Sequence, residues 1–272
     1  MRHLENARLH RLIQASPRIL SGGAPEGPEG FAALAALGVR TIVSVDGSRP
    51  DLAAAAAQNL RYVHIPFGYD GVPDLAALQI ARVLAETEGT IYFHCHHGRH
   101  RGPAAAAIAL RLDTGCAGPE ALELMRLAET DPQYEGLWRD VSAFIPPAPG
   151  TPLPALHEVA EVSDFTSGMA HLDRVWDRIK QIQSASWNTP TDHPDLVPAI
   201  EARIFAEAFA SLGRAVPEHL RTDAEFLRRL TAVKDNATAL HAALAAADSA
   251  SADARFQALK QGCTACHDRY RN

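Results

Sequence analysis

The chain has 272 residues, of which 47% are hydrophobic, and this length suits two small domains better than one. Its net charge is −6 with no block of basic residues, so we expect no nucleic acid and no anionic membrane surface among its partners. No apolar run is long enough to span a membrane, and 4 cysteines are too few for a disulfide scaffold.

The first part of the chain alternates between strand and helix patterns. Runs rich in β-branched or apolar residues predict strands at 40–45, 61–65 and 90–93. Helices are predicted between and after these strands, at 28–37, 74–87 and 103–112. This alternation predicts an α/β domain with a mainly parallel sheet and helices on both faces.

The third predicted strand runs into a loop with a Cys-x5-Arg motif, from Cys95 to Arg101. Successive backbone N–H groups of such a loop, together with the N-terminus of the next helix, can hold a phosphate. The arginine can then bind two phosphate oxygens at once. A thiolate in this positive field can attack phosphorus, which makes Cys95 the candidate nucleophile.

The run His94-Cys95-x-x-Gly98-x-x-Arg101 resembles the signature of the protein tyrosine phosphatase superfamily, and residues 16–25 resemble its dual-specificity branch. The resemblance covers about residues 15–145. It implies that Cys95 is the nucleophile, that Arg101 clamps the phosphate and that His94 orients the loop from behind. The loop residues expected to contact the substrate are His96, His97, Gly98, Arg99, His100 and Gly102.

Gly102 departs from the family pattern. The family usually places Ser or Thr after the arginine, where the hydroxyl stabilises the departing thiolate, so hydrolysis of the intermediate is expected to be slow here. A proton donor for the leaving oxygen is also needed. We prefer Asp70, which lies among turn residues after a strand, to Asp74, which is expected to cap the following helix.

Three other interpretations of residues 94–102 stay open. The four histidines around Cys95 could bind a transition metal, although the two arginines of the loop would repel a divalent ion. The loop could bind phosphate without catalysis, which Gly102 favours. Cys95 could also be a redox thiol, with Cys116 as its partner only if the fold brings the two close.

Residues 147–155 are rich in proline and predict a semi-rigid linker between a first domain, residues 1–146, and a second domain, residues 156–272. Beyond the linker, apolar residues recur every three or four positions in four segments. This pattern predicts an all-α antiparallel four-helix bundle.

The predicted bundle helices have recognisable limits. The apolar stripe of the first helix includes Val159 and Val162 and continues to Ile182. The second helix covers about residues 195–212. A capping box that begins at Thr222 opens the third helix.

The fourth helix ends with a Cys-x-x-Cys-His motif. Cys263 and Cys266 lie on one helical face, from which both thiols can reach the two vinyl groups of one porphyrin. His267 can then bind the iron as proximal ligand. A zinc site would need a second ligand pair, and a redox dithiol should follow a strand, so the motif favours covalently attached haem c.

This ending resembles the class II cytochromes c, the cytochrome c′ group, over about residues 156–272. The resemblance implies that Tyr270 and Arg271 lie near the haem. It also implies one of two roles. Family members in which a methionine from the first helix binds the iron carry electrons, whereas members in which the haem face opposite the histidine is open bind small gases. Met169 is the candidate sixth iron ligand, although Phe165 replaces an arginine that some relatives have.

Together the two resemblances predict a fusion protein that hydrolyses phosphomonoesters, with a phosphorylated protein or small molecule as substrate and with haem redox or ligand state as a modulator. The alternative is an electron-transfer or gas-sensing cytochrome whose first domain only binds an anion or a partner. A redox partner or a small gas ligand is expected, and the resemblance allows a homodimer through the first bundle helix. Because haem c is attached outside the bacterial cytoplasm, we expect a periplasmic protein whose export signal was trimmed from this sequence.

Overall fold

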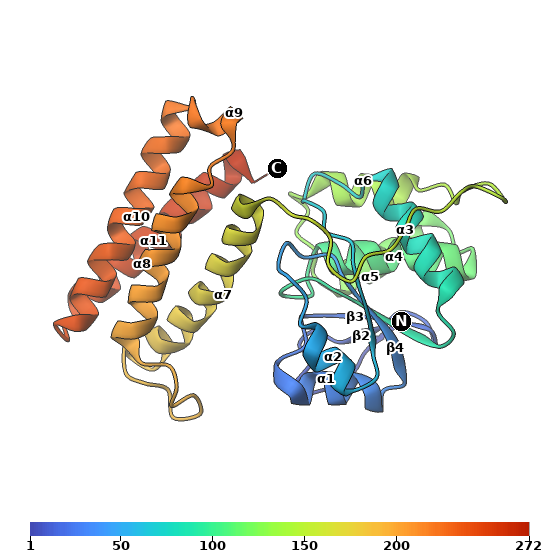
Figure 1. Cartoon of the computed structure of the whole chain (residues 1–272), viewed down its shortest axis with the longest axis horizontal. Helices are drawn as coiled ribbons and strands as arrows, with labels where there is room; N and C mark the ends of the chain where they lie inside the picture. Colours follow the sequence, from blue (N-terminus) through green and yellow to red (C-terminus); the bar gives the residue numbers. More distant parts are fainter. Residues whose placement is uncertain (272) are drawn as a thin grey trace. The chain divides into compact units, whose positions relative to one another are not determined.

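A computed structural model describes residues 1–271, and the chain separates into two compact units that divide between Glu161 and Val162. The first unit is α/β and the second is all helical (Figure 1). Over the described residues, no helix combines the length and apolar character that a membrane crossing requires. The linker predicted at residues 147–155 stays a prediction.

The first unit is built on a six-stranded sheet with the order β1-β2-β3-β6-β4-β5. Four strands run parallel, and they are β3 (Ile19–Gly22), β6 (Thr90–His94), β4 (Val39–Ser44) and β5 (Arg61–His64). The antiparallel strands β1 (Arg2–His3) and β2 (Ile13–Gln14) extend the sheet beyond β3. The prediction of a mainly parallel sheet is therefore confirmed.

Helices cover both faces of this sheet, as predicted. They are α1 (Gly27–Ala36), α2 (Leu52–Ala57), α3 (Asp74–Glu86), α4 (Arg101–Thr114), α5 (Gly118–Leu127) and α6 (Glu135–Ala143). Neighbouring residues of β4 pack into the separate cores on the two faces of the sheet. Ile42 packs with α1 and α2, whereas Val43 packs with α3 to α6. The sequence predicted α1, α3 and α4 but not α2, α5 or α6.

Residues 153–160, which we call the strap, contact the first unit on α3 and β5. Arg82 and Gln79 of α3 donate hydrogen bonds to three carbonyl groups of the strap, over 3.1 to 3.2 Å. The backbone N–H of His64 donates to the carbonyl of His157 over 2.8 Å. Since β5 is the last strand of the sheet, the strap lies against its open edge.

The second unit contains the helices α7 (Asp164–Ser184), α8 (Pro198–Arg214), α9 (Glu218–Arg221), α10 (Ala224–Ala245) and α11 (Ser249–Tyr270). The four long helices form the predicted antiparallel bundle (Figure 1). In its core, the ring of Trp176 on α7 stacks on Phe205 of α8 and Phe256 of α11, with centroids 5.4 and 4.7 Å away.

Two predicted helix starts in the bundle are wrong. Val159 and Val162 precede α7, because the hydroxyl of Ser163 caps the helix by accepting the N–H three residues later over 3.1 Å. The third long helix is capped by Asp223 rather than Thr222, since the Asp223 carboxylate accepts the N–H three residues later over 2.9 Å.

Candidate functional sites

The Cys-x5-Arg run forms the turn between β6 and α4. Cys95 directly follows the strand and is buried, and Arg101 is the first residue of the helix. The cysteine therefore lies at the carboxyl end of a parallel strand and at the N-terminus of a helix. In α/β sheets this is the place where oxyanions bind.

The end of β3 holds this turn in shape. Gly98 has φ +67°, and a Cβ there would lie 2.2 Å from the carbonyl carbon of Gly22. Only glycine combines this conformation with so close a backbone. The carbonyl of His96 accepts a hydrogen bond from the N–H of Ala24 over 2.9 Å.

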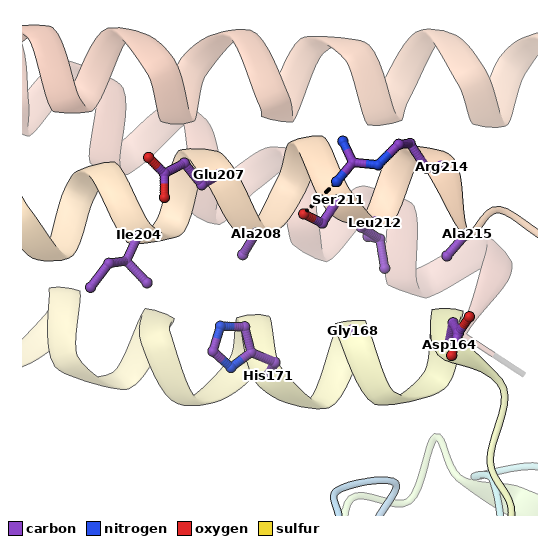
Figure 2. A pocket seen from close by; sticks show the side chains of 10 residues that line it. All are labelled: Asp164, Gly168, His171, Ile204, Glu207, Ala208, Ser211, Leu212, Arg214 and Ala215. Carbon is purple, nitrogen blue, oxygen red and sulfur yellow. Dashed lines mark hydrogen bonds between the residues drawn. The ribbon is translucent and has the colours of Figure 1, made fainter.

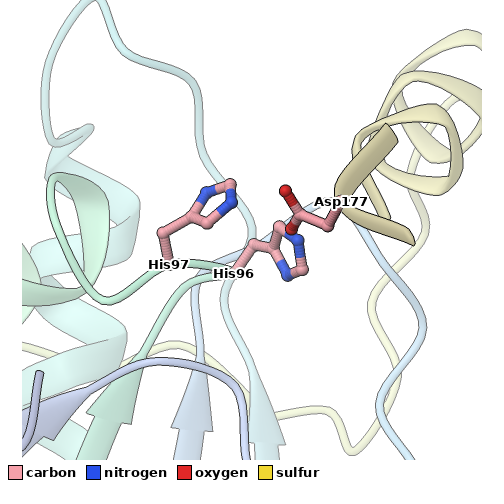
Figure 3. A group of neighbouring side chains, drawn as sticks. All are labelled: His96, His97 and Asp177. Atoms are coloured by element: carbon pink, nitrogen blue, oxygen red, sulfur yellow. The ribbon is translucent and has the colours of Figure 1, made fainter. Parts of the chain in front are cut away.

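The other loop side chains occupy distinct positions. The rings of His96 and His97 lie beside each other, with centroids 4.2 Å apart (Figure 3). Arg99 extends to Glu129, since its Nε donates to the Glu129 carbonyl over 3.1 Å. The Nδ1 atom of His100 accepts the N–H of a residue between α5 and α6 over 3.2 Å. Contact of these four side chains with a substrate stays a prediction.

Arg101 is buried and held on three sides. Its Nη2 donates to Asp46 Oδ1 over 3.0 Å, its Nη1 donates to the Phe67 carbonyl over 3.3 Å, and the Tyr69 ring centroid lies 4.4 Å from its guanidinium carbon. Burial opposes the charge, but interactions with Tyr69, Cys95 and Asp46 raise the pKa of Arg101 above its ordinary value. Within residues 1–271, its Nε has no hydrogen-bond partner. A permanent cation thus keeps one donor for a ligand.

Asp46 and Tyr69 are site residues that the sequence analysis missed. Asp46 follows β4 and is only 3% exposed, and β4 pairs directly with β6. An aspartate at the carboxyl end of a parallel strand is a signal that could have indicated it. Tyr69 adjoins the predicted proton donor, but nothing in its spacing indicates a contact with Arg101.

His94 lies behind the nucleophile in a buried hydrogen-bond chain. Its Nδ1 lies 3.3 Å from the Cys95 carbonyl, and its Nε2 lies 2.6 Å from the Tyr62 hydroxyl. Because a carbonyl only accepts, Nδ1 carries the proton and the Tyr62 hydroxyl donates to Nε2. This arrangement supports the predicted role of His94 in orienting the loop.

Asp70 is exposed in the loop between β5 and α3, next to the Tyr69 ring that covers the arginine. Asp140 of α6 holds this loop, because its Oδ2 accepts the N–H two residues after Asp70 over 2.9 Å. The prediction that Asp74 caps α3 is wrong. The cap position is occupied by Pro73, and Asp74 lies in the first turn. Asp70 remains the candidate proton donor.

Gly102 lies buried in the first turn of α4, against the backbone that carries the nucleophile. A Cβ at this position would lie 2.9 Å from the Cys95 nitrogen and 3.1 Å from the His94 Cα. Both neighbours are backbone atoms, so neither can move aside easily. The Ser or Thr that the phosphatase pattern has here would therefore require this backbone to shift.

The Cys-x-x-Cys-His motif occupies the end of α11. Cys263 and Cys266 are free thiols that pack against the bundle core. Burial raises the pKa of the Cys263 thiol to about 11, with Cys266 and Asp173 adding to the shift. Burial and the nearby Arg271 lower the pKa of His267 to about 4. The imidazole is thus neutral, which is the form that binds iron, so these donors fit a covalently attached haem.

The remaining haem candidates lie on α7 and after α11. Met169 is half-buried on α7 and packs against the bundle core. The hydroxyl of Tyr270 donates to Asp223 Oδ2 over 3.1 Å. Arg271 lies near enough to His267 to affect its pKa. Iron binding by Met169 and haem contacts of Tyr270 and Arg271 stay predictions.

A hollow of about 520 Å³ lies between α7 and α8, and Figure 2 shows the side chains that line it. His171 extends from α7 toward α8 (Figure 2), and Asp164, Glu207 and Arg214 bring charges of both signs. Burial and two nearby arginines lower the pKa of His171. The sequence predicted no site here.

Comparisons with known proteins find different relatives for the two ends of the chain. Residues 198–271 match the family model of Cytochrome C′. The amino-terminal half is similar to dual-specificity phosphatases. The chain thus joins an amino-terminal half that is similar to dual-specificity phosphatases to a carboxyl-terminal region that is similar to cytochrome c′.

The curated relative is the dual specificity protein phosphatase TpbA of Pseudomonas aeruginosa (strain UCBPP-PA14), 32% identical over 138 residues. The match covers 49% of this chain, which spans 61% of that relative's length. A crystal structure of P. aeruginosa TpbA is 31% identical over 49% of this chain and 81% of its own, with a TM-score of 0.38. A TpbA variant in complex with pTyr is 27% identical (48% and 90% covered, TM-score 0.37). Human DUSP28 is 22% identical (48% and 92% covered, TM-score 0.38).

Proposed function

We propose that the first unit hydrolyses phosphomonoesters through a phosphocysteine on Cys95. The observation that carries the proposal is the buried guanidinium of Arg101 at the end of the Cys-x5-Arg turn, with its Nε without a partner among residues 1–271. This donor, the N–H groups of the turn and the start of α4 together suit a phosphate. The similarity to TpbA, which is named a dual specificity phosphatase, supports the same reaction.

The proposed reaction has two steps. First, the Cys95 thiolate attacks phosphorus, the bond from phosphorus to the leaving oxygen breaks, and Asp70 protonates that oxygen. Second, water attacks the phosphocysteine, Asp70 takes the proton of that water, and the sulfur–phosphorus bond breaks to release phosphate. Arg101 binds the non-bridging oxygens throughout. Because Gly102 offers the departing thiolate no hydroxyl, we expect the second step to be slower.

Turnover of an aryl phosphate by the full-length protein tests this reaction. We expect the wild-type protein to release phosphate and the Cys95→Ser variant to release none. Cys116→Ser, the matched control on the other cysteine of this unit, should keep the wild-type rate. Equal rates for wild type and Cys95→Ser would remove the proposal. Tight vanadate binding without turnover would instead indicate a phosphate-binding module.

For the second unit we propose one haem c, joined to Cys263 and Cys266 by thioethers, with His267 as proximal ligand. The neutral imidazole and the inward-facing thiols support it. When bound, the group would supply electron transfer or the binding of a small gas. Met169 would bind the opposite iron face in the first case, and Tyr270 and Arg271 would lie beside the group. Haem c also implies a periplasmic protein and a redox partner or gas ligand, and the resemblance adds the proposal that two copies pair through α7.

Intact mass of the full-length protein, matured in a bacterial periplasm, tests the haem. We expect the polypeptide mass plus one haem, and the bare mass for the double variant Cys263→Ser, Cys266→Ser. A bare wild-type mass would contradict the proposal. The visible spectrum of Met169→Leu then tests the sixth ligand, because loss of a methionine should convert low-spin ferric haem to high-spin. An unchanged spectrum would exclude Met169.

A further inference from the structure

His64, at the end of β5, is a buried histidine for which the proposed reaction has no role. Its side chain is 1% exposed. Its Nε2 lies 2.8 Å from the carbonyl oxygen of Asp46, and its Nδ1 accepts the N–H of Ala160 over 3.1 Å. Its backbone N–H donates to the carbonyl of His157 over 2.8 Å. One residue thus contacts the end of β4 on one side and the strap on the other.

The two ring contacts fix the protonation state of His64. A backbone N–H can only donate, so Nδ1 is an unprotonated acceptor. A carbonyl oxygen can only accept, so Nε2 carries the hydrogen. The ring is neutral, and any other form would break one of the two hydrogen bonds.

The same contacts connect His64 to Arg101, the proposed phosphate clamp. The Asp46 carbonyl receives the hydrogen bond from His64, and the Asp46 carboxylate receives one from Arg101 over 3.0 Å. Oδ1 of Asp46 also accepts the N–H of Gly47 over 2.8 Å, which fixes the side chain against its own backbone. A change in the peptide plane at Asp46 would therefore move the carboxylate that holds Arg101.

We propose that His64 is a positioning residue for the phosphate clamp and that it links this clamp to the strap, so that oxyanion binding at Arg101 and docking of the strap stabilise each other. The proposal rests on the proposed phosphatase function. Such a linkage is reciprocal, because both events favour the same orientation of one imidazole. The strap is also the segment that leads directly into the second unit at Val162.

Two variants separate the two contacts. In His64→Asn, the amide oxygen lies near the place of Nδ1 and can still accept from Ala160, but the contact with Asp46 is lost. In His64→Gln, the amide nitrogen lies near the place of Nε2 and can still donate to Asp46, but the contact with Ala160 is lost. Arg82→Gln is the matched control, because it removes strap hydrogen bonds on α3 without touching His64.

Vanadate inhibition of aryl phosphate turnover and amide hydrogen exchange at Ala160, both on the full-length protein, test the proposal. We expect His64→Asn to weaken vanadate inhibition by about 5-fold and to raise KM more than it lowers kcat. His64→Gln should speed exchange at Ala160, make that exchange independent of vanadate, and weaken vanadate inhibition less than His64→Asn does. In wild type and in Arg82→Gln, vanadate should slow exchange at Ala160.

Measurements on the wild-type protein alone can overturn the proposal, so the test does not depend on whether a variant folds. Tight vanadate binding that leaves exchange at Ala160 unchanged would overturn the linkage and leave the phosphatase function standing. Wild-type inhibition constants in both His64 variants would do the same. A wild-type protein that neither binds vanadate nor turns over an aryl phosphate would overturn the phosphatase function, and this inference with it.

Discussion

Gly102 shows how packing can override a pattern expected for chemistry. Its α-carbon is so close to the backbone of the nucleophile that any Cβ would crowd the Cys95 nitrogen, at 2.9 Å. A hydroxyl at this position would require the turn and α4 to separate. The turn that binds the phosphate would then lose the geometry that the hydroxyl is meant to assist.

We therefore expect Gly102→Ser to destabilise the first unit by about 1–3 kcal/mol and to slow turnover rather than restore a missing function. Urea unfolding and aryl phosphate kinetics measure the two effects. Gly213→Ser is the control, since a Cβ at this helical glycine meets nothing within 4 Å, and stability should change by less than about 0.5 kcal/mol. A stable and faster Gly102→Ser enzyme would contradict the packing argument.

Tyr62 supplies the hydrogen bond that fixes the ring of His94. We expect Tyr62→Phe to cost about 1–3 kcal/mol, because a buried imidazole nitrogen loses its donor. Tyr92→Phe is the matched comparison, since it also loses a buried hydrogen bond, to the Gly23 carbonyl at 2.6 Å, whereas the Phe ring keeps the stacking of Tyr92 on His94, with ring centroids 5.9 Å apart. Both variants should unfold at a lower urea concentration than the wild-type protein, and only Tyr62→Phe should lower kcat/KM. Equal kinetics in both would show that Tyr62 has a structural role alone.

At this scale the sequence predicted the turn from Cys95 to Arg101 because its residues are contiguous and their spacing has a direct physical reason. It did not predict the contact of Asp46 with Arg101, although an aspartate directly after a predicted strand could have indicated a site residue. Asp46 meets Arg101 only because β4 and β6 are neighbours in the sheet. A contact between residues so far apart in the chain depends on strand order, which no local pattern contains.

Strand β5 is the element where a pH effect is expected. Burial lowers the pKa of His64 below its ordinary value of 6.5, so below that pH the unfolded chain binds a proton that the folded unit binds less well. The contribution of His64 to stability is therefore complete above about pH 6.5 and is lost as the pH falls toward its lowered folded pKa.

Unfolding of the first unit should thus become easier from about pH 7 to about pH 5.5, and His64→Gln should flatten this dependence. Chemical denaturation at several pH values measures it. Hydrogen bonds from arginines lower the pKa values of the Glu86 and Glu129 carboxyl groups from 4.5. These groups therefore titrate below this pH window and do not contribute to the expected slope. The same slope in wild type and variant would contradict the assignment to His64.

The misplaced start of α7 shows a limit of sequence patterns at the scale of elements. Val159 and Val162 continue the spacing of the helical stripe, although they precede the helix. Ser163 ends the irregular segment and caps the helix. Spacing alone does not tell a helix from an irregular stretch whose apolar residues fall at similar intervals.

At the scale of the whole molecule, the sequence predicted two folds because each has its own period and its own motif. It did not show that residues 153–160 are held by the first unit, since proline content indicates stiffness and not whether a segment is docked. Arg82, Gln79 and His64 donate the hydrogen bonds that hold the strap. Residues of these types also occur at ordinary surface or strand positions, so their presence in the sequence does not indicate a docked segment.

The boundary between the two units predicts which shortened proteins stay folded. We expect a protein of residues 1–161 to be monomeric and folded, because it keeps the strap on the open edge of β5. A protein of residues 1–146 should be less stable and should associate, because the backbone groups of β5 are then exposed for pairing. Light scattering and thermal unfolding of both proteins measure this. A monomeric and equally stable shorter form would show that the strap contributes nothing.

The docked strap also has a consequence for biogenesis. A polypeptide leaves the machinery that makes or exports it with its amino end first, so the strands of the sheet, which end at His94, emerge before residues 153–160. During that interval the newly formed β5 presents bare backbone to other nascent chains. The last residues of the first unit thus complete the protection of its own sheet, and a pause in emergence near residue 150 is expected to be the point of greatest risk for misassembly.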